Sequence, residues 1–146
     1  MNKAIEDFVG GKRIALAGIS RSGKKFGNTL FTELKGRGYD VFPVHPAAKE
    51  IGGTPCYPDL ASLKGRVDGA LVVLPPDKAL PVLRDAASAG VKNVWLQQGA
   101  ESPEAAALAE ELKLNLVNGR CILMYAQPVR SFHAFHRAVM KLFGRL

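Results

Sequence analysis

The sequence predicts an α/β domain in which a doubly wound, parallel sheet of five strands carries helices on both faces. Three observations lead to this prediction. Short apolar runs alternate with helical stretches, and each run ends at a loop marked by glycine or proline. The runs are continuously apolar, as in central strands that are covered on both faces. The length of 146 residues is usual for one domain with a single core.

The first two strands are predicted at 13–17 and 39–44, with a helix between them. Asn28 is placed to cap this helix, which runs to about Gly36 with its apolar side chains on one face. Gly38 suits the left-handed turn that ends a helix before the next strand.

The third and fourth strands are predicted at 69–74 and 93–96. The two prolines at 75–76 stop the third strand, and Asp77 is placed to cap the helix that follows. Gly90 is expected to end that helix and lead the chain into the fourth strand.

The last helix and strand of the sheet domain have clear start signals. Ser102 is a candidate N-cap, Pro103 suits the first helical position, and Glu104 suits the positive end of the helix dipole. A fifth strand is predicted at 114–117, with Asn115 in the left-handed turn before it.

The tail at 126–146 is predicted to form an amphipathic helix outside the main domain, which spans 1–125. One stripe is apolar and the other is basic; the apolar stripe holds Phe132, Phe135, Val139, Leu142 and Phe143, and the basic stripe holds Arg130, His133, Arg137, Lys141 and Arg145. We expect the apolar stripe to pack on the domain or on a second copy of the chain, which makes a homodimer possible. The alternative is binding of the basic stripe to an anionic membrane surface.

Composition narrows the class of protein. The net charge of +7 attracts phosphates, nucleic acid or acidic lipids without choosing among them. No stretch approaches the roughly 18–20 apolar residues of a membrane span, and the start of the chain lacks an apolar signal core. Cys56 and Cys121 have no metal-binding spacing and are read as reduced thiols. We therefore expect a cytoplasmic protein.

The loop at 18–25, after the first strand, nearly matches two phosphate-binding motifs. In the nucleoside-triphosphate motif G-x-x-x-x-G-K-[ST], Lys25 takes the place of the hydroxyl residue that holds Mg²⁺. In the dinucleotide motif G-x-G-x-x-G, Ser20 takes the place of the second glycine. The acid that would bind the ribose of NAD is also replaced, because the second strand ends in Val44-His45-Pro46. NAD is therefore disfavoured.

Basic residues around this loop favour a ligand with an additional phosphate. Arg21, Lys24, Lys25 and Lys49 are the residues concerned, and both NADP and coenzyme A carry such a phosphate. The simpler alternative is that Gly18 and Gly23 make a turn and the lysines are solvated surface.

Four ordered motifs extend these observations. They are G-x-S-R at Gly18–Arg21, G-Y-x-V-x-P-V-x-P at Gly38–Pro46, V-W-L-Q-x-G at Val94–Gly99, and R-C at Arg120–Cys121. From about Ile5 to Met124 the chain resembles the small, Rossmann-like CoA-binding-domain proteins, which are related to the CoA-binding domain of the succinyl-CoA synthetase alpha subunit. The family usually has Asn where this chain has His45, so the hydrogen bonding at that turn is open.

The resemblance implies a binding site for coenzyme A or an acyl-CoA. Backbone N–H groups around Ser20 and the Arg21 side chain would hold the phosphates, and Lys49 would bind the ribose phosphate. The ends of the third and fourth strands would line the pantetheine side. The complete set of expected ligand-binding residues is Gly18, Ile19, Ser20, Arg21, Lys25, His45, Pro46, Lys49, Leu74, Pro75, Pro76, Leu96, Gln97, Gln98 and Gly99.

No catalytic or metal-binding set is legible, since paired carboxylates, a nucleophile with its base, and a metal cluster are all missing from the pattern. We expect a non-catalytic binding, sensor or carrier domain. The alternative is an NADP-binding or CoA-dependent enzyme component whose catalytic groups come from a partner chain. A nucleic-acid binder is disfavoured, because no aromatic platform or recognition helix is apparent.

Overall fold

The computed structural model describes residues 3–126. Its main sheet contains β1 (Arg13–Ala17), β2 (Asp40–Val44), β5 (Gly69–Val72), β6 (Asn93–Gln97) and β7 (Asn115–Arg120), and β3 (Glu50–Ile51) and β4 (Thr54–Pro55) form a separate hairpin. The helices are α1 (Lys3–Gly10), α2 (Phe26–Gly36), α3 (Pro76–Ser88) and α4 (Pro103–Glu111), with short 3₁₀ turns η1 (Ala61–Leu63) and η2 (Ile122–Met124). Apart from Ala126, the predicted tail helix lies outside the described residues, so the division at 125/126 stays a prediction.

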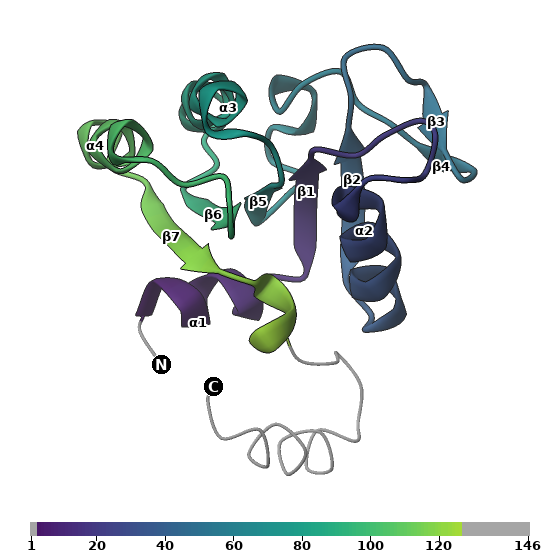
Figure 1. Cartoon of the computed structure of the whole chain (residues 1–146), viewed down its shortest axis with the longest axis horizontal. Helices are drawn as coiled ribbons and strands as arrows, with labels where there is room; N and C mark the ends of the chain where they lie inside the picture. The colour runs from purple at the N-terminus through teal and green to yellow at the C-terminus, as the bar shows by residue number, and fades with distance from the viewer. Residues whose placement is uncertain (1–2, 127–146) are drawn as a thin grey trace, which may run out of the picture.

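The main sheet has the order β2-β1-β5-β6-β7, and every pair of neighbouring strands is parallel. The chain passes from β1 outward to β2 and then returns to the other side of β1, where β5, β6 and β7 follow in sequence (Figure 1). The direction of winding therefore reverses between β1 and β5. This confirms the predicted doubly wound sheet of five parallel strands with a Rossmann-like arrangement.

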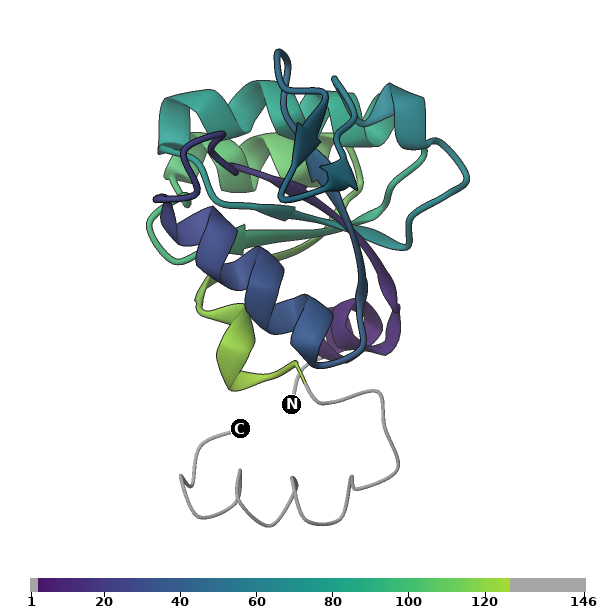
Figure 2. The ribbon, with the colours of Figure 1, turned by 90° about the vertical axis from the view of Figure 1, so that its right-hand side faces the viewer.

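Helices cover both faces of the sheet. Helices α1 and α2 lie on one face and α3 and α4 on the other (Figure 2), and each face has its own hydrophobic core. Trp95 of β6 is fully buried in the first core and contacts Phe8 of α1 edge to face, with ring centroids 5.4 Å apart. Leu96, the next residue along β6, belongs to the second core. Burial on both faces explains why the strands are continuously apolar.

Two of the predicted helix starts are wrong and one is confirmed. Helix α4 begins as expected, because the Ser102 hydroxyl accepts a hydrogen bond from the Ala105 amide at 3.0 Å. Helix α2 begins at Phe26, so Asn28 is inside the helix and does not cap it. Helix α3 begins at Pro76, which places Asp77 in its first turn. A proline in the first turn has the required φ and has no N–H to satisfy.

The entry to the last strand also differs from the prediction. Lys113 takes the left-handed conformation, with φ of 60°, and Asn115 is the first residue of β7. The strand extends to Arg120, beyond the predicted end at Val117. Pairing with β6 accounts for the additional length, since Gln97 is in register with Arg120 across a bulge.

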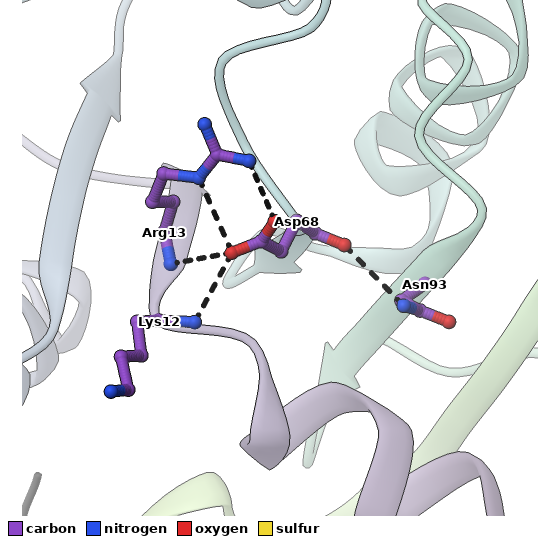
Figure 3. A network of polar contacts seen from close by, with 4 residues as sticks. All are labelled: Lys12, Arg13, Asp68 and Asn93. Atoms are coloured by element: carbon purple, nitrogen blue, oxygen red, sulfur yellow. Dashed lines mark hydrogen bonds and ion pairs between the residues drawn. The ribbon is translucent and has the colours of Figure 1, made fainter.

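Asp68 joins the amino ends of the central strands (Figure 3). Its carboxylate accepts hydrogen bonds from the amides of Lys12 and Arg13 and pairs with the Arg13 guanidinium at 2.9 Å. Its carbonyl accepts a hydrogen bond of 3.4 Å from the Asn93 side chain. The hydrogen bonds from the Arg13 side chain are the largest reason why the pKa of Asp68 lies below its usual value.

The end of the described chain is held on the α1/α2 face of the sheet. The Arg37 guanidinium, at the end of α2, donates hydrogen bonds to the carbonyls of Leu123 at 3.1 Å and Ala126 at 2.7 Å. Ala126 is buried in the core on that face. Helix α2 therefore fixes the position of residues 123–126 on this face.

We expect Asp68→Asn to lower the free energy of unfolding at pH 7 by about 1–2 kcal/mol, because hydrogen bonds to a charge are lost at a partly exposed position. Urea denaturation measures the change. Asp7→Asn is the control, since Asp7 forms only an exposed pair with Lys3 at 3.3 Å and its loss should cost less than about 0.5 kcal/mol. Equal effects of the two substitutions would contradict the structural role of Asp68.

The contribution of Asp68 should also depend on pH. Because its pKa is lower in the folded state, the stabilisation is present above the unfolded pKa of about 3.9 and is lost as the pH falls through the folded value. The difference in stability between wild type and Asp68→Asn should therefore be full at pH 7 and shrink in acid. Denaturation curves of the wild type and of Asp68→Asn, recorded at pH 7 and in acid, measure this difference.

Candidate functional site

A hollow of about 380 Å³ lies at the carboxyl ends of β1, β5 and β6, beside the point where the winding direction reverses. Open parallel sheets bind ligands at this position. Seven of the residues expected from the sequence line it, and all come from the loops that follow these strands or from the strand ends. They are Gly18, Lys25, Leu74, Pro75, Gln97, Gln98 and Gly99. Phe26, whose side chain is 51% exposed, also lines it.

Two glycines allow the loop after β1 to pass close to its neighbours. Gly18 has φ of 121°, and a Cβ atom there would overlap the carbonyl of Val73, which follows β5. A Cβ on Gly27 of α2 would overlap the carbonyl of Gly18 itself. The first turn of α2 therefore lies directly against the end of β1, and a side chain at Gly27 would separate the two, whereas one at Gly18 would push the end of β1 away from Val73.

The Asn28 side chain holds the loop by bonding to both the amide and the carbonyl of Ser20. Its Oδ1 accepts a hydrogen bond from the Ser20 amide and its Nδ2 donates one to the Ser20 carbonyl, each at 2.9 Å. The Asn28 side chain is almost fully buried, so these bonds are protected from water. The sequence indicated a polar residue with a local role here, but the role is to position the loop and not to cap the helix.

The bonds within the loop decide which amides remain for a ligand. Besides the Ser20 amide, those of Ser22 and Gly23 are engaged by the Ser20 hydroxyl and carbonyl, at 3.1 and 3.2 Å. The Ser20 amide is therefore bonded within the protein, and the binding of a phosphate by backbone N–H groups around Ser20 stays a prediction. The amides of Phe26 and Gly27 have no hydrogen-bond acceptor within residues 3–126, as is normal in the first turn of a helix. They lie beside the hollow and form the positive end of the α2 dipole.

The loop before α2 carries three cationic side chains. Arg21, Lys24 and Lys25 are exposed, and none of them forms an ion pair with another residue of the described chain. Lys25 lines the hollow, and Arg21 lines a neighbouring groove of about 700 Å³ between α2 and the β3–β4 hairpin. The loop therefore presents positive charge on two sides.

The ends of β5 and β6 form the opposite wall of the hollow. Gln97 is almost fully buried, and its Oε1 accepts a hydrogen bond of 3.0 Å from the Ile122 amide. Gly99 has φ of 103°, and its amide donates to the Glu101 carboxylate at 2.7 Å. Leu74 and Pro75 supply apolar surface. This wall therefore consists of apolar side chains and amide groups and carries little charge.

The His45 side chain accepts backbone hydrogen bonds in the turn after β2, as an asparagine side chain can. Its Nδ1 accepts hydrogen bonds from the amides of Ala47 and Ala48, both at 3.0 Å. An Asn side chain oxygen makes the same kind of turn. In the neutral ring the proton is then carried by Nε2, which is free of this turn. Pro46 and the exposed Lys49 belong to the same loop at the end of β2.

The remaining expected residues lie apart from the hollow. His45, Pro46 and Lys49 are at the end of the neighbouring strand and do not line it, and Pro76 is the first residue of α3. The side chains of Ile19 and Leu96 are buried in the two cores. Any contact of Ile19 or Leu96 with a ligand would therefore use backbone groups.

Within residues 3–126, no three His, Cys, Asp or Glu side chains are grouped so that they could hold a metal ion. None of the helices described is long and apolar enough to cross a membrane. Cys56 and Cys121 are both free thiols, and burial is the main reason why the pKa of Cys56 is raised.

Comparison with protein families identifies residues 12–127 as a match to the model of a CoA binding domain. The acetate–CoA ligase (ADP-forming) I of Archaeoglobus fulgidus is 27% identical over 136 residues, which are 86% of this chain and 20% of the ligase. Subunit alpha of the acetate–CoA ligase (ADP-forming) II of Pyrococcus furiosus is 26% identical over 81% of this chain and 28% of its own length. The chain thus spans between a fifth and a third of these relatives.

Solved structures agree with this match. A conserved hypothetical protein from Pyrococcus furiosus has 38% identity and a TM-score of 0.73, covering 77% of this chain and 97% of its own. The dinucleotide-forming acetyl-coenzyme A synthetase 1 of Ca. Korarchaeum cryptofilum has 29% identity and a TM-score of 0.65, covering 73% of this chain and 25% of the synthetase. Similar folds therefore occur both as small separate chains and inside larger enzymes.

We expect Gly27→Ala to lower the free energy of unfolding by about 1–3 kcal/mol, because the added methyl group pushes the first turn of α2 away from the end of β1. Urea denaturation measures this. Gly36→Ala, in the same helix and with no atom within 4 Å of the added Cβ, is the control and should be neutral or stabilising by up to about 1 kcal/mol. A Gly27→Ala variant as stable as wild type would contradict the close contact.

Proposed function

Since this chain belongs to the CoA-binding domain family, we propose that it binds coenzyme A or an acyl-CoA at the carboxyl ends of β1, β5 and β6. One observation carries the proposal: the free amides at the start of α2 and the unpaired Lys25 side chain border a hollow at the position where the winding direction reverses. Family membership and this geometry point to the same ligand class.

The diphosphate of the ligand would lie at the start of α2. The amides of Phe26 and Gly27 point outward from the helix end, where the dipole favours an anion. Arg21 and Lys25 would add charge-assisted hydrogen bonds, which are stronger than neutral ones. Asn28 keeps the loop in this shape before the ligand arrives, which lowers the entropy cost of binding.

The pantetheine arm would run along the wall formed by the ends of β5 and β6. Leu74 and Pro75 offer apolar surface to its methyl groups, and Gln98 and the backbone around Gly99 offer hydrogen-bonding groups to its amides. The adenosine part would lie towards the end of β2, where Pro46 and the Nε2 of His45 are available and where Lys49 would bind the ribose 3′-phosphate. Two loops would thereby recognise the two phosphate groups separately.

The proposed role is non-catalytic binding, as a sensor or carrier of the ligand in the cytoplasm. The hollow is lined by glycine, proline, aliphatic, aromatic and amide side chains and one lysine, so it presents surface for binding and not an acid–base pair. The similarity to ligases that are several times longer favours a second candidate, in which this chain is the CoA-binding part of an enzyme whose reacting groups belong to another chain.

Calorimetric titration with coenzyme A tests the proposal. We expect saturable binding, and we expect Arg21→Ala to weaken it by about 10- to 150-fold, because a charged hydrogen bond worth roughly 1.5–3 kcal/mol is removed. Lys92→Ala, which removes the same charge next to the amino end of β6, is the control and should bind as wild type does. Absence of binding by the wild type, or tighter binding of NADP, would overturn the proposal.

A cycle with dephospho-CoA tests the role of Lys49. The wild type should bind coenzyme A more tightly than dephospho-CoA, which lacks the ribose 3′-phosphate. Lys49→Ala should remove this preference and leave the affinity for dephospho-CoA unchanged, because only the lost ion pair distinguishes the two ligands. A preference that persists in Lys49→Ala would assign the ribose phosphate to another cation.

A further inference from the structure

A second concave surface lies on the face opposite the α1/α2 core, between α3 and α4. It has a volume of about 610 Å³. Its apolar part is formed by Leu80, Pro81, Ala107 and Leu108. The two helices contact each other along this surface, and no described element covers it (Figure 1). We refer to it as the α3–α4 groove.

The α3–α4 groove is acidic, although the chain as a whole is basic. Asp77, Glu104 and Glu111 line it, together with one basic residue, Arg84. None of these four side chains forms an ion pair with another residue in the described part of the chain. With a net charge of +7 for the protein, this groove is a local negative site with an apolar floor. Such a surface fits a segment that is both basic and apolar.

The last 20 residues of this chain, 127–146, have that chemistry. They contain four basic residues, Arg130, Arg137, Lys141 and Arg145, and no aspartate or glutamate. The helix predicted from Val129 onward has an apolar stripe beside its basic stripe. The apolar stripe matches the floor of the α3–α4 groove, and the basic stripe matches its carboxylates.

The end of the described chain and the α3–α4 groove lie on opposite faces of the sheet. Ala126 is buried on the α1/α2 face, and only Gln127 and Pro128 precede the predicted helix. The three steps from Ala126 to Val129 span at most about 11 Å, whereas α3 and α4 lie on the other face of the sheet (Figure 2). This short connection favours a tail segment that comes from a second copy of the chain.

We propose that two copies of this protein form a dimer in which residues 129–146 of each copy bind in the α3–α4 groove of the other. The exchange is reciprocal, so the two contacts are identical and related by a two-fold axis. The carboxylates of Glu104 and Glu111 pair with basic side chains of the incoming helix, and its phenylalanines cover Leu80 and Leu108. This interaction is independent of the ligand proposed above, because it lies outside the hollow.

Sedimentation velocity of the full-length chain at physiological salt tests the dimer. We expect the wild type to sediment as a dimer and Glu104→Lys/Glu111→Lys to have a dissociation constant at least about 100-fold higher, because attraction is replaced by like-charge repulsion. Glu6→Lys/Glu110→Lys changes the net charge equally at exposed positions that do not line the groove, and it should remain dimeric. Circular dichroism confirms that all variants are folded.

Reversal of charge on the tail completes the test. Arg137→Glu/Lys141→Glu should also dissociate the dimer, and the combination with Glu104→Lys/Glu111→Lys should restore it. A monomeric wild type, a dimer that survives the groove substitutions, or a combined variant that stays monomeric would each overturn the proposal. Binding of the wild type to anionic vesicles that is unaffected by the groove substitutions would assign the tail to a membrane surface instead.

Discussion

The close contact between the end of β1 and the start of α2 is the constraint from which the rest of the binding region follows. The carbonyl of Gly18 occupies the space where a side chain at Gly27 would be, and Gly18 in turn lies against the carbonyl of Val73. Three backbone segments from β1, α2 and β5 therefore meet without intervening side chains. Because backbone and not side chain borders the hollow here, a ligand can approach the amides at the helix end directly.

Asn28 and His45 act in the same way. Each polar side chain forms hydrogen bonds with backbone groups of a turn. Asn28 closes the loop after β1 from inside α2, and His45 closes the loop after β2 from its first residue. Each accepts from amides that would otherwise remain unpaired. The two loops next to the proposed ligand are thus shaped by internal bonds, and the cations on them are left without internal partners.

The amino and carboxyl edges of the sheet differ in how their polar groups are paired. At the amino edge, Asp68 joins β1 to β5 and its carbonyl joins β5 to β6, so polar groups are paired within the protein. At the carboxyl edge, the helix amides and basic side chains are left unpaired. The outer face at α3 and α4 is different again, since its carboxylates oppose the charge of the whole chain. The ion pair that we expect to stabilise the fold, the proposed ligand site and the proposed association surface therefore lie on separate parts of the molecule.

Local apolar runs and backbone restrictions were enough to predict the fold class, the positions of the five main strands, and the glycine and proline turns, and they pointed to the region of the candidate site. The start of α2, the two hydrogen bonds between Asn28 and Ser20, and the burial of Ile19 and Leu96 became visible only in the folded chain. The fold also decided which amides stay free. These features depend on atoms that are distant along the chain, such as Gly18 against Val73, and no local pattern records a contact of that kind.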